Sequence, residues 1–204
     1  MSIRTVAITS AKGGGGKTSL SHALALGAAW NEVLAHLFYT DTGEAIQTQG
    51  RPYNYYSANT KAKLAEEVAT IANDDGILII DSGGNRHDFD AFIAEFIELV
   101  LIPVTPDSED IKRALSHAQH MKQAGANNIK FVVNKMPSLK ASARVKADRH
   151  INKLPDALIL CTIPIRSAIG DLRDDDIADF KTPSTPVNNL SRALYDSVIL
   201  ELEK

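Results

Sequence analysis

Short runs of apolar, β-branched residues alternate along the chain with longer stretches of helical periodicity. The pattern predicts strands at 3–9, 33–40, 76–80, 99–104, 129–133 and 157–163. It predicts helices at 17–32, 61–72, 89–96, 110–124, 138–153 and 187–203, and a polar loop at 42–60. Strands that alternate with helices indicate βαβ units. The expected fold class is therefore α/β, with a doubly wound, mostly parallel sheet covered by helices on both faces.

Two of the predicted strands are apolar without alternation, at 77–80 and 99–102. Strands of this kind are typical of parallel sheets that are buried on both faces. The chain has no internal repeat, and the Pro-containing stretch at 182–186 is too short to separate domains. We therefore expect a single domain over residues 1–204.

A glycine-rich segment follows the first predicted strand and reads Ser-Ala-Lys-Gly-Gly-Gly-Gly-Lys-Thr at 10–18. A strand, a glycine run, Lys-Thr and then a helix is the context of a P-loop, although the first glycine of the general pattern is Ala11 here. Glycines let successive backbone N–H groups surround a polyphosphate. Lys17 is expected to reach the β- and γ-phosphates, and the Thr18 hydroxyl to bind Mg²⁺.

The segment at 12–18 matches KGGxGK[ST] and so resembles the deviant Walker A motif of the ParA/MinD ATPases. The resemblance extends over nearly the whole chain, whose length is similar to that of the small plasmid-type ParA proteins. It implies a P-loop NTPase that uses ATP and Mg²⁺ and dimerises around ATP, with Lys12 as the lysine that contacts nucleotide across the dimer. It also implies a set of nucleotide-binding residues at the loop: Gly13, Gly14, Gly15, Gly16, Lys17, Thr18 and Ser19.

Two aspartates lie where the family places acidic residues. Asp41 follows the second predicted strand at the Walker A′ position, where a carboxylate orients the attacking water. The family usually reads D-x-D-P-Q there, whereas this chain reads Tyr-Thr-Asp-Thr-Gly at 39–43. Asp81 ends an apolar strand and resembles the Walker B aspartate, which holds Mg²⁺ through water. The Ser-Gly-Gly at 82–84 resembles a switch that senses the γ-phosphate.

Later segments resemble the family in the same order. The stretch at 99–106 is similar to its D-x-V-I-I-P-V-x-P-S segment. Asn134 matches the asparagine that contacts adenine, and an amide offers the base edge both a donor and an acceptor. A plain chain-turning role for Asn134 stays open. Pro164 and Arg166 match the late segment that packs on the base.

The charge of the chain is unevenly distributed. It has 22 basic and 25 acidic residues, and this net charge of −3 argues against a uniformly basic nucleic-acid-binding protein. The segment 135–153 nevertheless has six basic residues and only one acidic residue, Asp148. A basic helix face either contacts the phosphate backbone of DNA or is simply solvated. The resemblance favours DNA, and the candidate contacts are basic residues of this segment: Lys140, Arg144, Lys146, Arg149 and Lys153.

Several other classes of site are less favoured. Cys161 is the only cysteine, so the chain cannot form an internal disulfide or hold an iron–sulfur cluster through paired cysteines. His117 and His120 share a helix face without an apparent third metal ligand, and Asp88 near His87 is expected to cap a helix. The last predicted helix is expected to pack on the core and not to bind membrane. With no signal peptide or membrane span in the sequence, we expect a cytoplasmic protein.

Taken together, these observations predict a ParA-like ATPase that binds DNA non-specifically as an ATP-dependent homodimer. Such a protein segregates or positions a plasmid, a chromosome region or another cargo, and a ParB-like partner stimulates its hydrolysis. One alternative keeps the ATPase but changes the cargo, to MinD-like placement or conjugative transfer. Another is an ATP-dependent ligase of the dethiobiotin-synthetase type, against which Lys12 argues because those enzymes lack the signature lysine.

Overall fold

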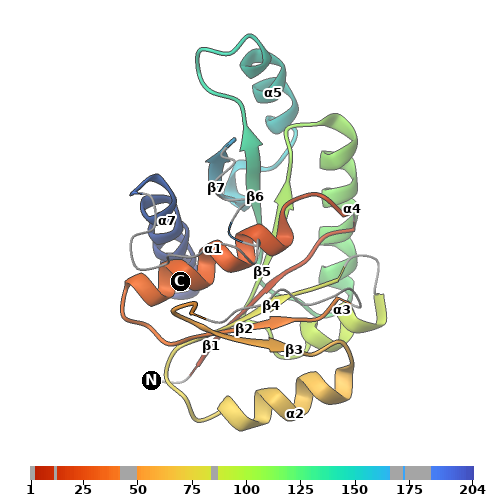
Figure 1. The fold of residues 1–204 in the computed structure, drawn as a ribbon. Helices are drawn as coiled ribbons and strands as arrows, with labels where there is room; N and C mark the ends of the chain where they lie inside the picture. The colour runs from red at the N-terminus through yellow and green to blue at the C-terminus, as the bar shows by residue number, and fades with distance from the viewer. Residues whose placement is uncertain (1–2, 12, 42–49, 84–86, 166–171, 173–184) are drawn as a thin grey trace.

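The computed structural model describes residues 3–11, 13–41, 50–83, 87–165, 172 and 185–204 (Figure 1). Its strands are β1 (Arg4–Ile8), β2 (Ala35–Tyr39), β3 (Asn54–Ser57), β4 (Ile77–Asp81), β5 (Leu99–Val104), β6 (Ile129–Met136) and β7 (Ile159–Pro164). Its helices are α1 (Lys17–Trp30), α2 (Lys61–Ile71), α3 (His87–Ala94), α4 (Ser108–Gln123), α5 (Ala143–Ile151) and α7 (Thr185–Leu202), with a 3-10 turn η1 (Asp156–Leu158).

The strands form one sheet in the order β3-β2-β4-β1-β5-β6-β7, and every neighbouring pair is parallel. The predicted doubly wound parallel sheet is therefore confirmed. Strand β1 lies between β4 and β5, so the chain order reverses at this strand. In open α/β sheets such a switch point opens a crevice at the carboxyl ends of the strands, where ligands bind.

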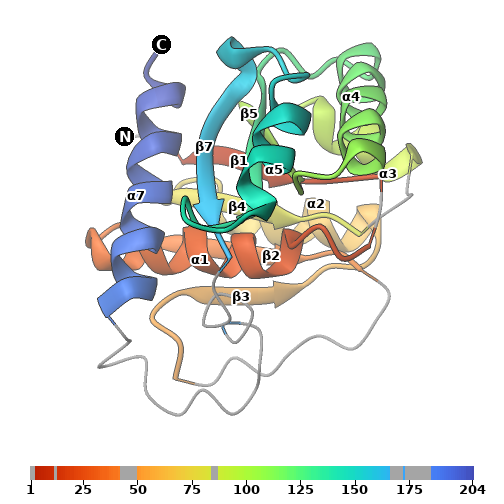
Figure 2. The same cartoon turned by 90° about the horizontal axis from the view of Figure 1, so that it is seen from above.

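The two faces of the sheet are covered by different helices (Figures 1 and 2). One apolar core joins α1 and α7 to strand residues such as Val6, Ile8 and Ile79. The other joins α2, α3, α4 and α5 to the alternate residues, such as Ala7 and Ile80. Because successive residues of a strand point to opposite faces, the unbroken apolar runs supply both cores at once.

Strand β3 differs from the sequence-based expectation, which placed a polar loop over 42–60. It is a four-residue edge strand parallel to β2. Its tyrosines stack on β2, with ring centroids 4.7 Å apart for Phe38 and Tyr56 and 6.3 Å apart for Tyr39 and Tyr55. The partly exposed Asn-Tyr-Tyr-Ser sequence lacks the apolar signal of a central strand, and only pairing with β2 makes it a strand.

Helix α7 packs along α1, as expected for the last apolar helix. Leu194 and Val198 are buried in the core, and Leu190 and Leu202 pack against it. At the closest approach a Cβ added to Gly27 would lie 2.1 Å from the Ser191 carbonyl oxygen, so α1 needs a glycine there. Among the helices described, none is long and apolar enough to cross a membrane.

A small lobe projects beyond the sheet after β6 (Figure 1). We define the basic lobe as residues 137–153, which include α5. The predicted helix at 138–153 is shorter than expected, because α5 begins at Ala143 and β6 continues to Met136. Two large apolar side chains of the lobe are solvent-exposed, Leu139 by 82% and Val145 by 69%.

Candidate functional site

The glycine loop lies between the central strand β1 and the start of α1. Gly14 and Gly16 have φ values of +84° and +95°, a left-handed conformation that favours glycine. Gly16 caps α1, and a Cβ on it would lie 2.2 Å from Nδ2 of Asn134. The loop therefore leads directly into a helix N-terminus, where free N–H groups and the helix dipole favour an anion.

Of the predicted nucleotide-binding residues, the four glycines lie in the loop and the last three lie in the first turn of α1. Lys17 and Thr18 are half-buried and Ser19 is buried. Asp41 is exposed just after β2, so it is near the same edge of the sheet. Lys12 and Arg166 lie outside the described residues, so their predicted roles are not placed in space.

Asp81 ends β4 between the two strands that carry the other candidate residues. It is in register with Ile8 of β1 and with Tyr39 of β2 and is only 3% exposed. Burial raises the pKa of Asp81 to about 7, while a hydrogen bond with Thr18 and the charge of Lys17 act in the opposite direction. Its buried Oδ1 atom has no hydrogen-bond partner. The site thus contains a buried carboxyl group with one oxygen atom that has no hydrogen-bond partner.

The residues at this position fit a hydrated Mg²⁺. Mg²⁺ prefers oxygen ligands, keeps several waters and is usually held by one or two protein side chains together with phosphates. Thr18 offers a hydroxyl and Asp81 an unpartnered buried oxygen, on adjacent elements. No group of three or more His, Cys, Asp or Glu side chains suited to a metal occurs in the part of the chain that the structure describes.

The ends of β2 and β4 are joined through Thr40. Its backbone N–H and its hydroxyl donate to the Asp81 carbonyl at 3.1 and 3.0 Å, and the Gly83 N–H donates to its hydroxyl at 3.2 Å. The residue before Asp41 is thus bonded to the residues around Asp81. A shift at Gly83 would therefore also move Thr40, the residue next to Asp41.

A buried polar network lies behind the loop and was not anticipated from the sequence. The Thr9 hydroxyl lies 2.9 Å from Nε2 of His117 and donates to Asp90 at 3.2 Å, and the Ser82 hydroxyl donates to Asp90 at 3.3 Å. All four residues are at most 4% exposed. His117 therefore has a structural partner, and its ring also stacks on that of His120 at 6.1 Å. The network connects the ends of β1 and β4 to α3 and α4.

Asn134 approaches the site from β6. Its Nδ2 donates to the Gly15 carbonyl at 3.1 Å, and its Oδ1 accepts from the Lys135 N–H at 2.8 Å. An amide has a second N–H and a second lone pair, so these bonds leave capacity for a base and the adenine contact stays a prediction. Pro164 ends β7 beside Met136, next to this segment.

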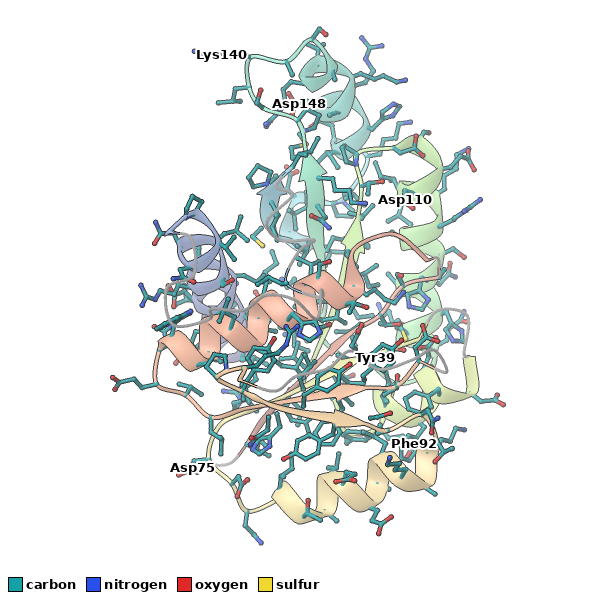
Figure 3. All side chains as sticks on the ribbon, viewed as in Figure 1. Tyr39, Asp75, Phe92, Asp110, Lys140 and Asp148 are labelled. Carbon is teal, nitrogen blue, oxygen red and sulfur yellow. The ribbon has the colours of Figure 1, made fainter. Side chains whose placement is uncertain are left out.

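The predicted DNA contacts all belong to the basic lobe but differ in their environment. Arg144 donates to Asp148 and to the Pro137 carbonyl at 2.8 and 3.2 Å. Lys153 lies 3.5 Å from the Ser108 hydroxyl. The other three are exposed and form no ion pair within the described residues: Lys140, Lys146 and Arg149. Figure 3 shows Lys140 at the outer end of the lobe.

No protein-family model and no curated protein matches the chain by sequence. Among solved structures, it is similar to the septum site-determining protein MinD of Pyrococcus horikoshii OT3 complexed with Mg-ADP. The TM-score is 0.72 at 15% identity, and the match covers 96% of each chain. It is also similar to a Borrelia burgdorferi B31 protein described as a plasmid partition protein and bound to AMPPNP. Here the TM-score is 0.73 at 14% identity, over 98% of this chain and 99% of that one.

A ParA family ATPase from Chlorobium tepidum TLS has a TM-score of 0.64 at 14% identity, over 93% of this chain and 97% of that one. At such identities the likenesses establish the fold. The chain has the fold of the MinD and ParA-type ATPases, and the predicted α/β P-loop architecture is confirmed.

Proposed function

We propose that the protein is a ParA-like ATPase of the deviant Walker A type, a single domain that uses ATP and Mg²⁺. The observation that carries the proposal is a KGGxGK[ST] sequence located on a glycine loop at the switch point of a MinD/ParA-type fold, with Thr18 and the buried Asp81 at its base. Neighbours of the same fold were solved with Mg-ADP and AMPPNP, which supports the choice of nucleotide.

Each residue has a defined task in this proposal. Lys17 neutralises the β- and γ-phosphates, and Thr18 and Asp81 hold Mg²⁺, Asp81 through water. When bound, Mg·ATP supplies the phosphoanhydride bond that is cleaved. Asp41 orients the attacking water, and its exposed position just after β2 leaves it open to solvent. Lys12 reaches the nucleotide of a second protomer, so the active species is a homodimer.

The cellular role that we propose is DNA-based positioning. The ATP-bound dimer binds DNA without sequence preference through the basic lobe and so segregates or positions a plasmid, a chromosome region or another cargo in the cytoplasm. A ParB-like partner stimulates hydrolysis and resets the dimer. The supporting observation is that Lys140, Lys146 and Arg149 are exposed on a projecting lobe, where two copies in a dimer would present them to one duplex.

A second candidate keeps the ATPase but directs it to MinD-like placement, and the MinD neighbours favour it. Packing of α7 on α1 buries much of the apolar face that a terminal membrane-binding helix would need, so this candidate has less support here. A metabolic ATP-dependent ligase is the least supported alternative, because its family lacks the signature lysine.

The decisive experiment combines ATP turnover with light scattering. We expect slow Mg²⁺-dependent hydrolysis by the wild type, loss of nucleotide binding in Lys17→Ala, and a dimer that persists with Mg·ATP in Asp41→Ala because hydrolysis no longer resets it. Lys112→Ala, a change at an exposed lysine on α4, is the control and should behave as wild type. An Asp41→Ala protein that stays monomeric in saturating Mg·ATP would contradict the dimer, and turnover that requires a small organic acid would indicate the ligase.

A further inference from the structure

Two consecutive residues of β6 contact the glycine loop. The Asn134 amide donates to the Gly15 carbonyl and the Lys135 ammonium donates to the Gly14 carbonyl, each at 3.1 Å. The side chains of neighbouring residues in a regular strand point to opposite faces. A double contact with one loop therefore requires that β6 is irregular at this point.

The irregularity is present in the backbone. The register between β6 and β7 shifts between Val133 and Met136. Lys135 has a φ of +57°, a left-handed conformation that is uncommon for a residue with a side chain. Bulges of this kind re-aim side chains and are frequent next to active sites. The strand thus holds a strained residue at the place where both side chains reach the loop.

The two contacts determine how the loop peptides are oriented. In a planar trans peptide the C=O group and the following N–H group point in opposite directions. The Gly14 carbonyl belongs to the same peptide as the Gly15 N–H, and the Gly15 carbonyl to the same peptide as the Gly16 N–H. When both carbonyls are held toward β6, both N–H groups turn away from it, as a bound phosphate would require.

We propose that Asn134 and Lys135 form a loop clamp that presets the glycine loop for phosphate, and that Lys135 is a positioning residue. The inference rests on the proposed function, since it takes the ligand to be a nucleotide phosphate. Lys135 acts through the Gly14 carbonyl and not on the phosphate itself. It therefore belongs functionally to the nucleotide site, although in the sequence it is part of the basic segment.

Three substitutions at Lys135 distinguish loss of the loop clamp from loss of overall protein stability. Lys135→Met removes the ammonium and keeps most of the side-chain length. Lys135→Arg keeps a cationic donor. Lys135→Gly removes the donor at a φ that glycine adopts without strain, so its thermal midpoint should be at least that of the wild type. Loss of function in Lys135→Gly is therefore not explained by unfolding.

The first measurement is equilibrium binding of Mg·ATP and Mg·ADP by titration calorimetry. Since a hydrogen bond with a charged donor is lost at an exposed position, we expect Lys135→Met and Lys135→Gly to bind both nucleotides about threefold to tenfold more weakly. Lys135→Arg should restore binding to within about twofold of the wild type. A loss confined to Mg·ATP would mean that Lys135 contacts the γ-phosphate directly, which contradicts the clamp.

The second measurement is the backbone amide NMR order parameter of the nucleotide-free protein. We expect lower order parameters at residues 13–16 in Lys135→Met and Lys135→Gly, with the chain away from position 135 unchanged and Lys135→Arg similar to the wild type. Unchanged order parameters and unchanged affinity in the Met and Gly variants would overturn the proposal. If the wild type binds no nucleotide, the proposed function fails, and the order parameters still decide whether the clamp orders the loop.

Discussion

Gly14 and Gly16 adopt similar left-handed conformations but have different surroundings. Nothing lies within 4 Å of a Cβ added to Gly14, whereas a Cβ on Gly16 would overlap the Asn134 amide. Alanine is strained to a similar extent at both positions. The pair therefore separates the cost of the backbone conformation from the cost of displacing Asn134.

We predict that Gly14→Ala lowers the free energy of unfolding by about 1 kcal/mol, the usual cost of a left-handed alanine. Gly16→Ala should lower it by about 1 to 3 kcal/mol more, because Asn134 has to move. Urea unfolding of the nucleotide-free variants measures both values. Equal losses would show that the contact between Gly16 and Asn134 is unimportant.

His22 makes the stability depend on pH. It is buried on α1, its Nδ1 lies 2.7 Å from the Tyr53 hydroxyl, and its ring stacks on Tyr55 at 5.5 Å. Burial and the charge of Arg51 lower its pKa to about 3. In the unfolded chain it titrates near 6.5. Between these values the unfolded state binds the proton that the folded state rejects, so stability falls as pH is lowered through this window.

We predict that protonation of His22 in the unfolded chain lowers the free energy of unfolding by on the order of 3 kcal/mol when the pH is lowered from about 7 to about 4.5. His22→Gln should lose distinctly less stability than the wild type over this range in urea unfolding experiments. His150→Gln, at a partly exposed histidine on α5, is the control and should follow the wild type. An equal acid loss in wild type and His22→Gln would contradict the assignment.

At the scale of elements, the contact between α1 and α7 depends on Gly27. The glycine lets the Ser191 backbone approach closely, and the Trp30 ring, one turn further along α1, lies 5.7 Å from the Arg192 guanidinium carbon. Helix propensity alone predicts that alanine at position 27 stabilises α1 by about 1 kcal/mol. Packing predicts a loss of stability instead, because the alanine Cβ would overlap the Ser191 backbone, which cannot rotate away as a side chain can.

We predict that Gly27→Ala destabilises the protein by about 2 kcal/mol or more, measured by urea unfolding. Ala29→Gly on the same helix is the comparison, and it should cost only about 1 kcal/mol through propensity. A stabilised Gly27→Ala protein would mean that α7 does not pack on α1 as described.

At the scale of the whole molecule, the net charge of −3 is an average over two regions of opposite sign. The segment 135–153 has a net charge of +5, and its exposed part projects beyond the sheet (Figures 1 and 3). Arg144 is paired with Asp148, whereas Lys140, Lys146 and Arg149 are exposed and have no ion pair among the residues that the structure describes, so these three are the cations to test.

We predict that replacing these three residues with glutamine lowers the affinity of the ATP-bound protein for arbitrary duplex DNA at least tenfold. The slope of log affinity against log salt should decrease by about 2 to 3, since each phosphate contact contributes about 0.9. Fluorescence anisotropy measures both quantities, and ATP turnover without DNA should not change.

The control for this experiment replaces three exposed lysines outside the lobe, at positions 61, 63 and 122. Since they lie on α2 and α4, this variant has the same net charge as the lobe variant but leaves the lobe intact. Equal losses in the two variants would indicate a general charge effect and contradict DNA binding by the lobe.

The sequence by itself determined the order of the elements apart from β3, the parallel sheet and the position of the glycine loop. These depend on local signals: apolar runs mark buried strands, helical periodicity marks helices, and glycines before Lys-Thr mark a phosphate loop. It also placed Asp81 at the end of a buried strand, because a carboxylate that follows an apolar run is visible from sequence neighbours alone.

The tertiary structure alone decided which distant residues meet. Edge strand β3 exists because β2 offers it a partner, and the network of Thr9, Asp90 and His117 forms because two helices and a strand end converge. Lys135 was counted with the basic segment, yet a bulge in β6 turns it to the glycine loop. Such contacts depend on strand register and backbone conformation, which one-dimensional patterns of charge and hydrophobicity do not encode.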